Sequence, residues 1–435
     1  MKPLLSWLSP HLSRRRFLQN LLGGFSATAA LPFLQGCASG SWGRVVIVGG
    51  GFGGASCAAY LARTASKMDV TLVEKSPRFI TCPFSNAVIG SFKQMAAITH
   101  DYDGLRRRGV RVVNTTVSAI EAVGRQVILE DGTRLDYDRL VLSPGVDMKW
   151  NEVEGYDQAA SQTMPHAWKA GEQTLLLHRQ LETMDDGGVV IIAVPTNPYR
   201  CPPAPYERAC LMAHYLIRHK PRSKIIILDA KDSFTKQDLF IQGWEKLYPN
   251  MIQWVPASQG GAVTHVDPAT RTFYCEAGAF HADTANMVPP QCAGEVARMA
   301  GVANDDNEWC LVDPRTFEST IIPGIHILGD ACYAGAMPKS GFAANSHGKA
   351  CAAALISLLA GREVKDPIFL NTCYSLLAPD YGISINAAYL AGEQGIVPLY
   401  GSGGTSPLDA PPEVRRDEAK YAEGWYASMI EEMFG

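Results

Sequence analysis

The chain has 435 residues, more than one ordinary domain needs, so its length alone favours two or three domains. Hydrophobic residues make up 47% and charged residues 19% of the chain, and both values indicate a well-buried globule. The net charge is −4, which gives no reason to expect nucleic-acid binding, and no basic run supports it.

The first 40 residues are predicted to be an export signal outside the fold. Residues 13–18, Ser-Arg-Arg-Arg-Phe-Leu, resemble a twin-arginine signal, and the mildly apolar residues 18–34 are too short and interrupted to span a membrane. Twin-arginine export carries folded proteins, usually with a cofactor already bound. We therefore expect a periplasmic protein; the alternative is a disordered basic tail. Residues 34–37, Leu-Gln-Gly-Cys, also resemble a lipoprotein cleavage box, and lipidation of Cys37 and plain cleavage both stay open.

A glycine-rich turn follows and is the strongest motif of the chain. Residues 45–48 are a short apolar run that predicts a buried parallel strand, and residues 55–64 predict a helix. Between them stand Gly49, Gly51 and Gly54 in the spacing G-x-G-x-x-G. The first glycine permits the tight turn, the second lets a pyrophosphate approach the backbone, and the third lets helix and strand pack closely. The helix N-terminus then faces the phosphates.

The next strand supplies the acid that such a motif requires. Residues 70–73 predict a second strand, which ends at Glu74, where a carboxylate holds a ribose hydroxyl in dinucleotide-binding domains. The motif therefore predicts dinucleotide binding; the alternative is an ordinary tight turn. Cys82 lies in the turn-rich loop that follows and, on chemistry alone, could be a nucleophile, a ligand, an attachment point or none of these.

The first domain continues through three more predicted strands. Residues 111–117 and 126–129 are two of them, and residues 137–145 close on Pro-Gly, a pattern that brings the chain back to the cofactor. Val117 and Gly145 are accordingly predicted to contact the cofactor. A domain boundary is expected near residue 150.

The second unit has the pattern of a nucleotide-binding domain without its phosphate loop. A helix is predicted over 170–184, a strand over 188–194, a helix over 206–219 and a strand over 224–228. Between the first strand and the second helix stand prolines, which lack N–H donors for phosphate. NAD(P)H is therefore not expected as the electron source.

A second flavin motif is predicted in the last third of the chain. A strand predicted over 325–330 ends at Gly329-Asp330, where the aspartate is expected to hold ribityl hydroxyls. Lys339 precedes a small-residue helix predicted over 342–359, whose N-terminus would face the flavin ring; the alternative for Lys339 is a solvated loop lysine. A terminal helix over 413–435 is expected to pack into the core through a stripe of residues four apart: Tyr421, Trp425, Met429 and Met433. The alternative for this stripe is a partner-protein surface.

The chain has eleven cysteines, spread along its length. No C-x-x-C, no metal-ligand spacing and no C-x-x-C-H haem motif occurs, so neither a metal site nor a haem of its own is predicted. Most of the cysteines are expected to be small buried hydrophobic residues.

Several unusual strings resemble the flavoprotein subunit of flavocytochrome c sulfide dehydrogenase. They are Thr81-Cys82-Pro83 and residues 166–172 (HAWKAGE), 201–208 (CPPAPYER), 329–332 (GDAC), 337–341 (MPKSG) and 371–374 (NTCY). The resemblance implies FAD attached through a thioether at Cys82, a redox-active disulfide between Cys201 and Cys373, and a separate c-type cytochrome subunit. The alternative for the two cysteines is a disulfide that only ties down the C-terminal segment.

The predicted fold is α/β and glutathione-reductase-like, with two Rossmann-type dinucleotide-binding domains and a C-terminal α+β domain. The boundaries expected are 41–155 with 286–362 for the FAD domain, 156–285 for the second domain and 363–435 for the third.

The expected function is oxidation of sulfide to sulfur or polysulfide, with electrons passing to the cytochrome. Glu207 is a candidate proton shuttle; its alternative is a first-turn carboxylate that stabilises the helix dipole. Two other functions stay open, a sulfide:quinone oxidoreductase-like enzyme and a non-catalytic flavoprotein partner of a sulfur-oxidising system.

Overall fold

The computed structural model describes residues 42–304, 308–393 and 395–435. The predicted export signal and Cys37 lie outside the described residues. Residues 41–435 form one compact unit. None of the described helices is both long enough and apolar enough to cross a bilayer.

The first sheet contains the glycine-rich turn at its centre. Its five strands are all parallel and have the order β20-β9-β1-β2-β5. Their bounds are Arg44–Val48 (β1), Asp69–Val73 (β2), Arg111–Val113 (β5), Arg139–Leu142 (β9) and Ile325–Ile327 (β20). The buried branched residues of β1 explain its central position, because both faces of a central parallel strand are covered.

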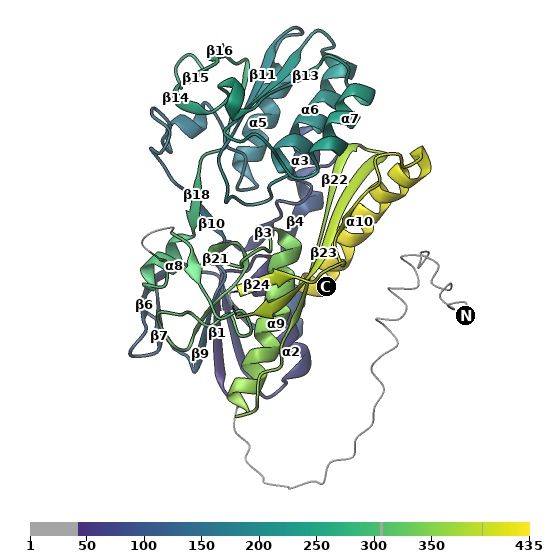
Figure 1. Cartoon of the computed structure of the whole chain (residues 1–435). Coiled ribbons are helices and arrows are strands. Elements are labelled where there is room, and N and C mark those ends of the chain that lie inside the picture. Colours follow the sequence, from purple (N-terminus) through teal and green to yellow (C-terminus); the bar gives the residue numbers. More distant parts are fainter. Residues whose placement is uncertain (1–41, 305–307, 394) are drawn as a thin grey trace, which may run out of the picture. The chain divides into compact units, whose positions relative to one another are not determined.

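Two helices cover this sheet and pack against each other. These are α2 (Phe52–Thr64) and α9 (Gly341–Leu359), which lie side by side in Figure 1. Small residues permit the close approach: a Cβ atom on Gly348 would lie 2.4 Å from Gly53 O. A buried hydrogen bond of 2.7 Å from Asn345 Nδ2 to Ser56 Oγ joins the two helices.

The second sheet is also parallel, with the order β13-β12-β11-β17. Its strands are Val189–Val194 (β11), Lys224–Asp229 (β12), Ile252–Val255 (β13) and Thr284–Met287 (β17). Its helices are α5 (Glu172–Thr183), α6 (Ala204–His219) and α7 (Gln237–Leu247), drawn in teal in Figure 1.

A long antiparallel hairpin and a terminal helix complete the chain. The hairpin consists of β22 (Ile368–Ala378) and β23 (Tyr381–Gly392), with β24 (Gly395–Pro398) and β25 (Gly404–Thr405) paired to β23. Helix α10 (Pro412–Phe434) lies along the hairpin (Figure 1). Strand β22 spans two hydrophobic cores, since Phe369 near its start is buried with the first sheet and Leu377 near its end with the second.

The remaining elements are short. They are β3 (Arg78–Ile80), α3 (Ser85–Ile89), η1 (Met95–Ile98), β4 (Thr99–Asp101), α4 (Asp103–Arg107), β6 (Val117–Glu121), β7 (Gln126–Leu129), β8 (Arg134–Asp136), β10 (Val146–Met148), η2 (Ala160–Gln162), η3 (Ala257–Gln259), β14 (Val263–Asp267), β15 (Thr272–Cys275), β16 (Gly278–His281), β18 (Gln291–Ala293), α8 (Glu295–Met299), β19 (Cys310–Leu311), η4 (Gly329–Ala331) and β21 (Cys332–Tyr333).

The predicted strand over 111–117 is wrong as a single element. Strand β5 ends at Val113, and β6 begins at Val117 in a separate sheet. The chain turns between them at Asn114, whose Nδ2 donates to the carbonyl oxygens of Glu74 (3.3 Å) and Ser76 (3.1 Å).

The predicted apolar stripe of α10 is wrong at its first member. Tyr421 is 56% exposed, whereas Met429 and Met433 are buried as expected. Residues four apart advance 400° around a helix, so a strict four-residue stripe rotates by about 40° per step away from the core. Tyr426, which the stripe omits, is buried instead.

Candidate functional site

The glycine-rich turn has the close approaches that its motif predicts. Gly49 has φ +102°, and a Cβ on Gly54 would lie 1.9 Å from Gly49 O, so only glycine fits at this contact between strand and helix. Glu74 follows β2 directly. Its Oε2 accepts a 2.7 Å hydrogen bond from Gly50 N, and its Oε1 accepts one of 3.0 Å from Ser76 N. The predicted acid therefore lies against the predicted phosphate turn.

Asp330 offers an unused acceptor in the interior. It lies in η4, directly after β20, and its Oδ1 atom is buried without a hydrogen-bond partner. Burial raises the pKa of its carboxyl group. A buried polar atom that no protein group satisfies indicates that a bound molecule supplies the donor. A ribityl hydroxyl of a flavin is such a donor, so this observation fits FAD.

Lys339 is held beside Asp330 by the backbone. Its Nζ donates to the carbonyl oxygens of Asp330 and Cys332, both at 2.8 Å, and lies 3.7 Å from the ring centroid of Trp309. Burial lowers the pKa of this amine. Lys339 is therefore not a solvated loop lysine, and its charge lies against the backbone of η4 and β21.

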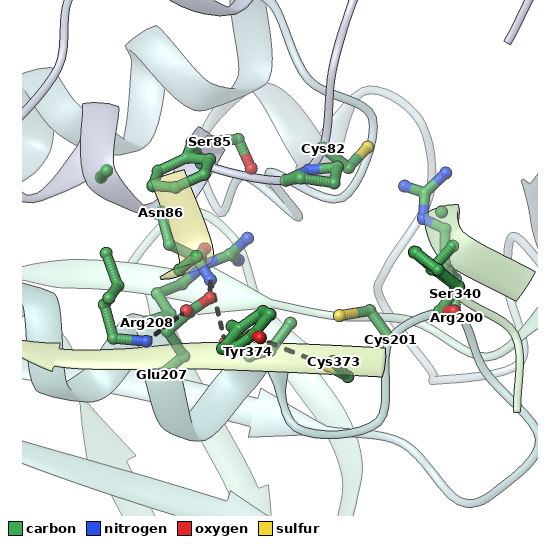
Figure 2. A pocket seen from close by; sticks show the side chains of 18 of the residues that line it. Cys82, Ser85, Asn86, Arg200, Cys201, Glu207, Arg208, Ser340, Cys373 and Tyr374 are labelled. Atoms are coloured by element: carbon green, nitrogen blue, oxygen red, sulfur yellow. Dashed lines mark hydrogen bonds between the residues drawn. The ribbon is translucent and has the colours of Figure 1, made fainter. Parts of the chain in front are cut away.

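Four predicted site residues from distant parts of the chain line one cavity of about 100 Å³: Cys82, Cys201, Glu207 and Cys373. Figure 2 shows Cys82 on one side and Cys201 and Cys373 together on the other. The Cys82 Sγ atom lies 3.5 Å from Trp168 O. Aromatic and aliphatic side chains form most of the wall, among them Phe84, Trp168, Phe342, Leu376 and Trp425.

Cys201 has a strained backbone. Its φ is +56°, in the left-handed region that non-glycine residues seldom adopt. Its N–H donates to Lys339 O at 2.8 Å, and its carbonyl accepts from Ala204 N at 2.9 Å as α6 begins. These bonds fix the Cys201 side chain toward the cavity.

Cys373 lies in the middle of β22, paired with Ile385 of β23. Both are free cysteines in this structure, not joined in a disulfide. The interaction with Cys373 and burial raise the pKa of Cys201 well above its ordinary value. The same interaction lowers the pKa of Cys373 to about 7, against the opposing effect of burial. Cys373 Sγ also lies 3.8 Å from Tyr374 O.

Glu207 connects α6 to the cysteine strand. Its Oε1 accepts from Leu376 N of β22 at 2.8 Å, and its Oε2 accepts from Asn86 Nδ2 at 2.8 Å. Burial raises the pKa of this carboxyl group, against the opposing effect of its hydrogen bonds. Its side chain reaches another element rather than the N–H groups of its own helix.

In the second domain, side chains occupy the edge of the sheet at which a dinucleotide-binding domain would hold its nucleotide. Asp229 ends β12, where a dinucleotide domain places the acid that holds a ribose. Its Oδ2 accepts from Tyr206 OH (2.5 Å) and Trp254 Nε1 (3.0 Å), and its Oδ1 accepts from Lys231 Nζ (2.6 Å). The Tyr206 ring stacks on Phe234 with centroids 3.6 Å apart.

Val117 and Gly145 are predicted cofactor residues that, like the glycine turn, Glu74, Asp330 and Lys339, lie outside the cavity lining. Val117 begins β6 and is buried in the first core, and Gly145 has φ +67° just after β9, with its carbonyl accepting from Gly294 N at 2.9 Å. Their contact with a cofactor stays a prediction.

The sequence analysis missed Asn86 and Lys236, which contact Glu207 and the Cys373 carbonyl oxygen respectively. Neither belongs to a motif whose spacing could have revealed it.

The fold and the glycine turn together define a class of protein. Residues 39–163 match the family model of pyridine nucleotide-disulphide oxidoreductases. The structure resembles the sulfide:quinone oxidoreductase of Aquifex aeolicus, with a TM-score of 0.68 and 17% identity over 89% of this chain and 92% of that one. It also resembles putidaredoxin reductase in its complex with putidaredoxin, with a TM-score of 0.63 and 17% identity over 89% and 99% of the two chains. The predicted α/β, two-sheet fold is confirmed.

Two further matches define the particular family. Residues 174–289 match the central model of the sulfide dehydrogenase [flavocytochrome c] flavoprotein chain, and residues 365–434 match the flavocytochrome c sulphide dehydrogenase flavin-binding model. A curated flavoprotein chain of that name from Chlorobaculum thiosulfatiphilum is 64% identical over 45 residues, which are 10% of this chain and 94% of the relative. The chain therefore belongs to the family of flavocytochrome c sulfide dehydrogenase flavoproteins.

A more distant relative is the mitochondrial sulfide:quinone oxidoreductase of Dictyostelium discoideum. It is 29% identical over 186 residues, which are 42% of this chain and 40% of that relative. The match thus spans less than half of the relative's length. The family is one of sulfide-oxidising flavoproteins, and its models include FAD-binding domains.

Proposed function

We propose that this protein is a sulfide dehydrogenase that oxidises sulfide at the Cys201–Cys373 pair and passes the electrons through FAD to a c-type cytochrome. One observation carries the proposal: two cysteines that are far apart in sequence line one side of a largely apolar cavity, with Cys82 on the other side. The membership in a family of sulfide-oxidising flavoproteins supports it.

The first chemical step takes place on the oxidised pair. Hydrosulfide attacks one sulfur of the Cys201–Cys373 disulfide, a new S–S bond forms, and the old one breaks. The products are a persulfide on one cysteine and a thiolate on the other, so atoms and charge balance. Of the two cysteines, the one whose thiol has the lower pKa leaves faster. Two electrons remain in the sulfur atoms and must then be removed to re-form the pair and release oxidised sulfur.

FAD supplies the acceptor for that electron pair and can release the electrons singly to a haem protein. The residues that would hold it are the glycine turn with Glu74 at the nucleotide end, and Asp330 and Lys339 at the flavin end. Cys82 is proposed as the site of a covalent thioether to the flavin. Glu207 is proposed to move protons to and from the sulfur atoms, because its buried carboxyl group is hydrogen-bonded to the strand that carries Cys373.

The choice of cytochrome over NAD(P)H rests on the second domain. A ribose at the end of β12 would have to displace Tyr206 or Trp254 from Asp229. Export to the periplasm, proposed from the twin-arginine pattern, would place the protein where c-type cytochromes are found. Quinone is the second candidate acceptor, because relatives and a structural neighbour are sulfide:quinone oxidoreductases.

An anaerobic titration tests the proposal. Sulfide added to the purified protein should bleach the flavin absorbance, NADH should not, and added cytochrome c should restore the colour. The Cys201→Ser variant should keep its flavin but lose bleaching by sulfide.

Flavin bleaching by NADH would contradict the interpretation of the second domain. Full sulfide activity in Cys201→Ser would contradict the disulfide mechanism. Re-oxidation by a soluble quinone but not by cytochrome c would replace the proposed acceptor with the second candidate.

A further inference from the structure

Lys236 is a buried lysine next to the cysteine strand. It lies in the loop before α7, has φ +64° and is 8% exposed. Its Nζ donates to Cys373 O at 3.2 Å and to the buried Ser375 Oγ at 2.8 Å. The side chain therefore reaches from the second domain to the strand that carries Cys373.

This lysine has no carboxylate partner. Among the ion pairs of residues 42–304, 308–393 and 395–435, none includes Lys236. Lys231, in the same loop and also largely buried, pairs with Asp229 at 2.6 Å. A charge removed from water is costly unless an opposite charge or strong hydrogen bonds compensate it. Something near Lys236 is therefore expected to carry negative charge in at least one state of the protein.

Three groups near Lys236 can carry that charge. They are Cys201 in the loop before α6, Glu207 on α6 and Cys373 on β22, and the charge of Lys236 lowers the pKa of each. For Cys201 this effect is outweighed, because the interaction with Cys373 and burial raise its pKa. For Glu207 it is outweighed by burial, which raises the pKa of the carboxyl group. Cys373 is the group whose pKa falls below its ordinary value, to about 7. Lys236 also donates a hydrogen bond to the backbone carbonyl oxygen of Cys373 itself.

We propose that Lys236 is the counter-ion of a thiolate at Cys373 in the reduced cysteine pair. Two electrons and one proton open the disulfide; the proton goes to Cys201, and the Cys373 sulfur keeps the negative charge. The Cys201 S–H bond then donates to that sulfur. Lys236 is a positioning residue, because it acts on the reaction through Cys373. The inference deepens the proposed function, since it concerns the same pair.

The alternative is that Lys236 only fastens β22 to the second domain. Three substitutions separate the two roles. Lys236→Met removes the charge and the hydrogen bonds, Lys236→Gln keeps a donor without the charge, and Lys236→Arg keeps the charge. A matched control is Lys246→Met, the same substitution at an exposed lysine of α7.

The experiment measures the thiolate without sulfide. The purified flavoprotein is reduced anaerobically with a phosphine and labelled with iodoacetamide from pH 5.5 to 9.5, and peptide mass spectrometry gives the rate at each cysteine. Only the thiolate reacts, so the rate follows its population. We expect Cys373 to react with a midpoint near pH 7. In Lys236→Met and Lys236→Gln the midpoint should rise by about one unit or more, which slows labelling at pH 7 about fivefold or more. Lys236→Arg and Lys246→Met should resemble the unmodified protein.

An unchanged midpoint in folded Lys236→Gln overturns the inference, as does faster labelling of Cys201 than of Cys373. Far-UV circular dichroism and bound-flavin absorbance establish that each variant is folded. If Lys236→Met does not fold, the result for Lys236→Gln decides between the two roles. The proposed function fails separately: a shifted midpoint with no flavin bleaching by sulfide would retain the thiolate assignment and reject sulfide oxidation.

Discussion

The Glu207 side chain links two separate elements of the candidate site, strand β22 and helix α3. Its two carboxyl oxygens accept from β22 and from Asn86 at once, and neither partner is close to it in sequence. The sequence alone offered two roles for this residue, proton transfer and stabilisation of its own helix. The structure adds a third, the positioning of the strand that carries Cys373.

We expect Glu207→Gln to separate proton transfer from positioning. Glutamine keeps an acceptor for Leu376 N but cannot take up or release a proton. The rate of flavin reduction by sulfide should fall by about 10²-fold or more, the range for loss of a general acid or base, and should lose its dependence on the ionisation of this group. Stopped-flow measurements across pH 6–9 check this. An unchanged pH profile would leave Glu207 with the positioning role alone.

At this scale, the sequence could single out residues that stand in distinctive strings. Cys82, Cys201 and Cys373 belong to such strings, and the structure brings all three to one cavity. Lys236 could not be predicted, because a lone loop lysine has no periodicity or spacing that distinguishes it from a solvated one. Its significance comes only from tertiary burial and from the carboxylate it lacks.

Helix α9 depends on a cap that also fastens β22. Ser340 Oγ accepts from Ala343 N at 3.0 Å and donates to Asn371 Oδ1 at 2.7 Å, so one hydroxyl group serves the helix N-terminus and the cysteine strand. The helix N-terminus in turn lies next to Lys339, at the proposed flavin end of the site.

Ser340→Ala should therefore destabilise the protein by about 1–2 kcal/mol, because it removes an N-cap and leaves the buried Asn371 oxygen without its donor. Urea unfolding followed by circular dichroism measures the loss. Ser357→Ala, near the other end of the same helix, is the control and should change the midpoint little. Equal midpoints for the two variants would contradict the role of the cap.

The boundaries of the regular elements were mostly predictable, and the exceptions have local causes. Parallel strands such as β1 and β11 are continuous apolar runs, which periodicity detects. Strand β22 is not, because its centre reads Asn-Thr-Cys-Tyr-Ser and interrupts the apolar run, although Thr and Tyr are residues that suit a strand; pairing with β23 defines its full length.

At the scale of the whole molecule, three buried histidines make the fold sensitive to acid. Burial lowers the pKa of His166 and His347 to about 3 and that of His326 to about 4. His166 Nδ1 accepts a hydrogen bond from Trp168 N at 2.9 Å, which a proton on that nitrogen would break. All three are neutral in the folded protein at neutral pH.

Each of these histidines has a lower pKa in the folded protein than in the unfolded chain. Its contribution to the free energy of unfolding is therefore fully present above about pH 6.5 and is lost as the pH falls toward the pKa of the folded protein. At pH 5 the loss is about 2 kcal/mol for each histidine, or roughly 6 kcal/mol together. We expect the thermal midpoint to fall by several degrees between pH 7 and pH 5, as scanning calorimetry can measure.

His166→Asn, which keeps an acceptor for Trp168 N but does not titrate in this range, should show a smaller fall. His281→Asn, at an exposed position of β16, should show the same fall as the unmodified protein. An equal fall in both variants would contradict the assignment to buried histidine.

Strand β22 is anchored in both hydrophobic cores, with Cys373 between the two anchors. In the proposed mechanism the sulfur–sulfur bond opens while both ends of the strand stay anchored and Cys201 stays held by its own backbone hydrogen bonds. Each sulfur would then experience the other at a very high effective concentration, which favours ring closure over capture by a thiol from solution. The rigidity proposed to position the pair would thus also protect it from mixed disulfides.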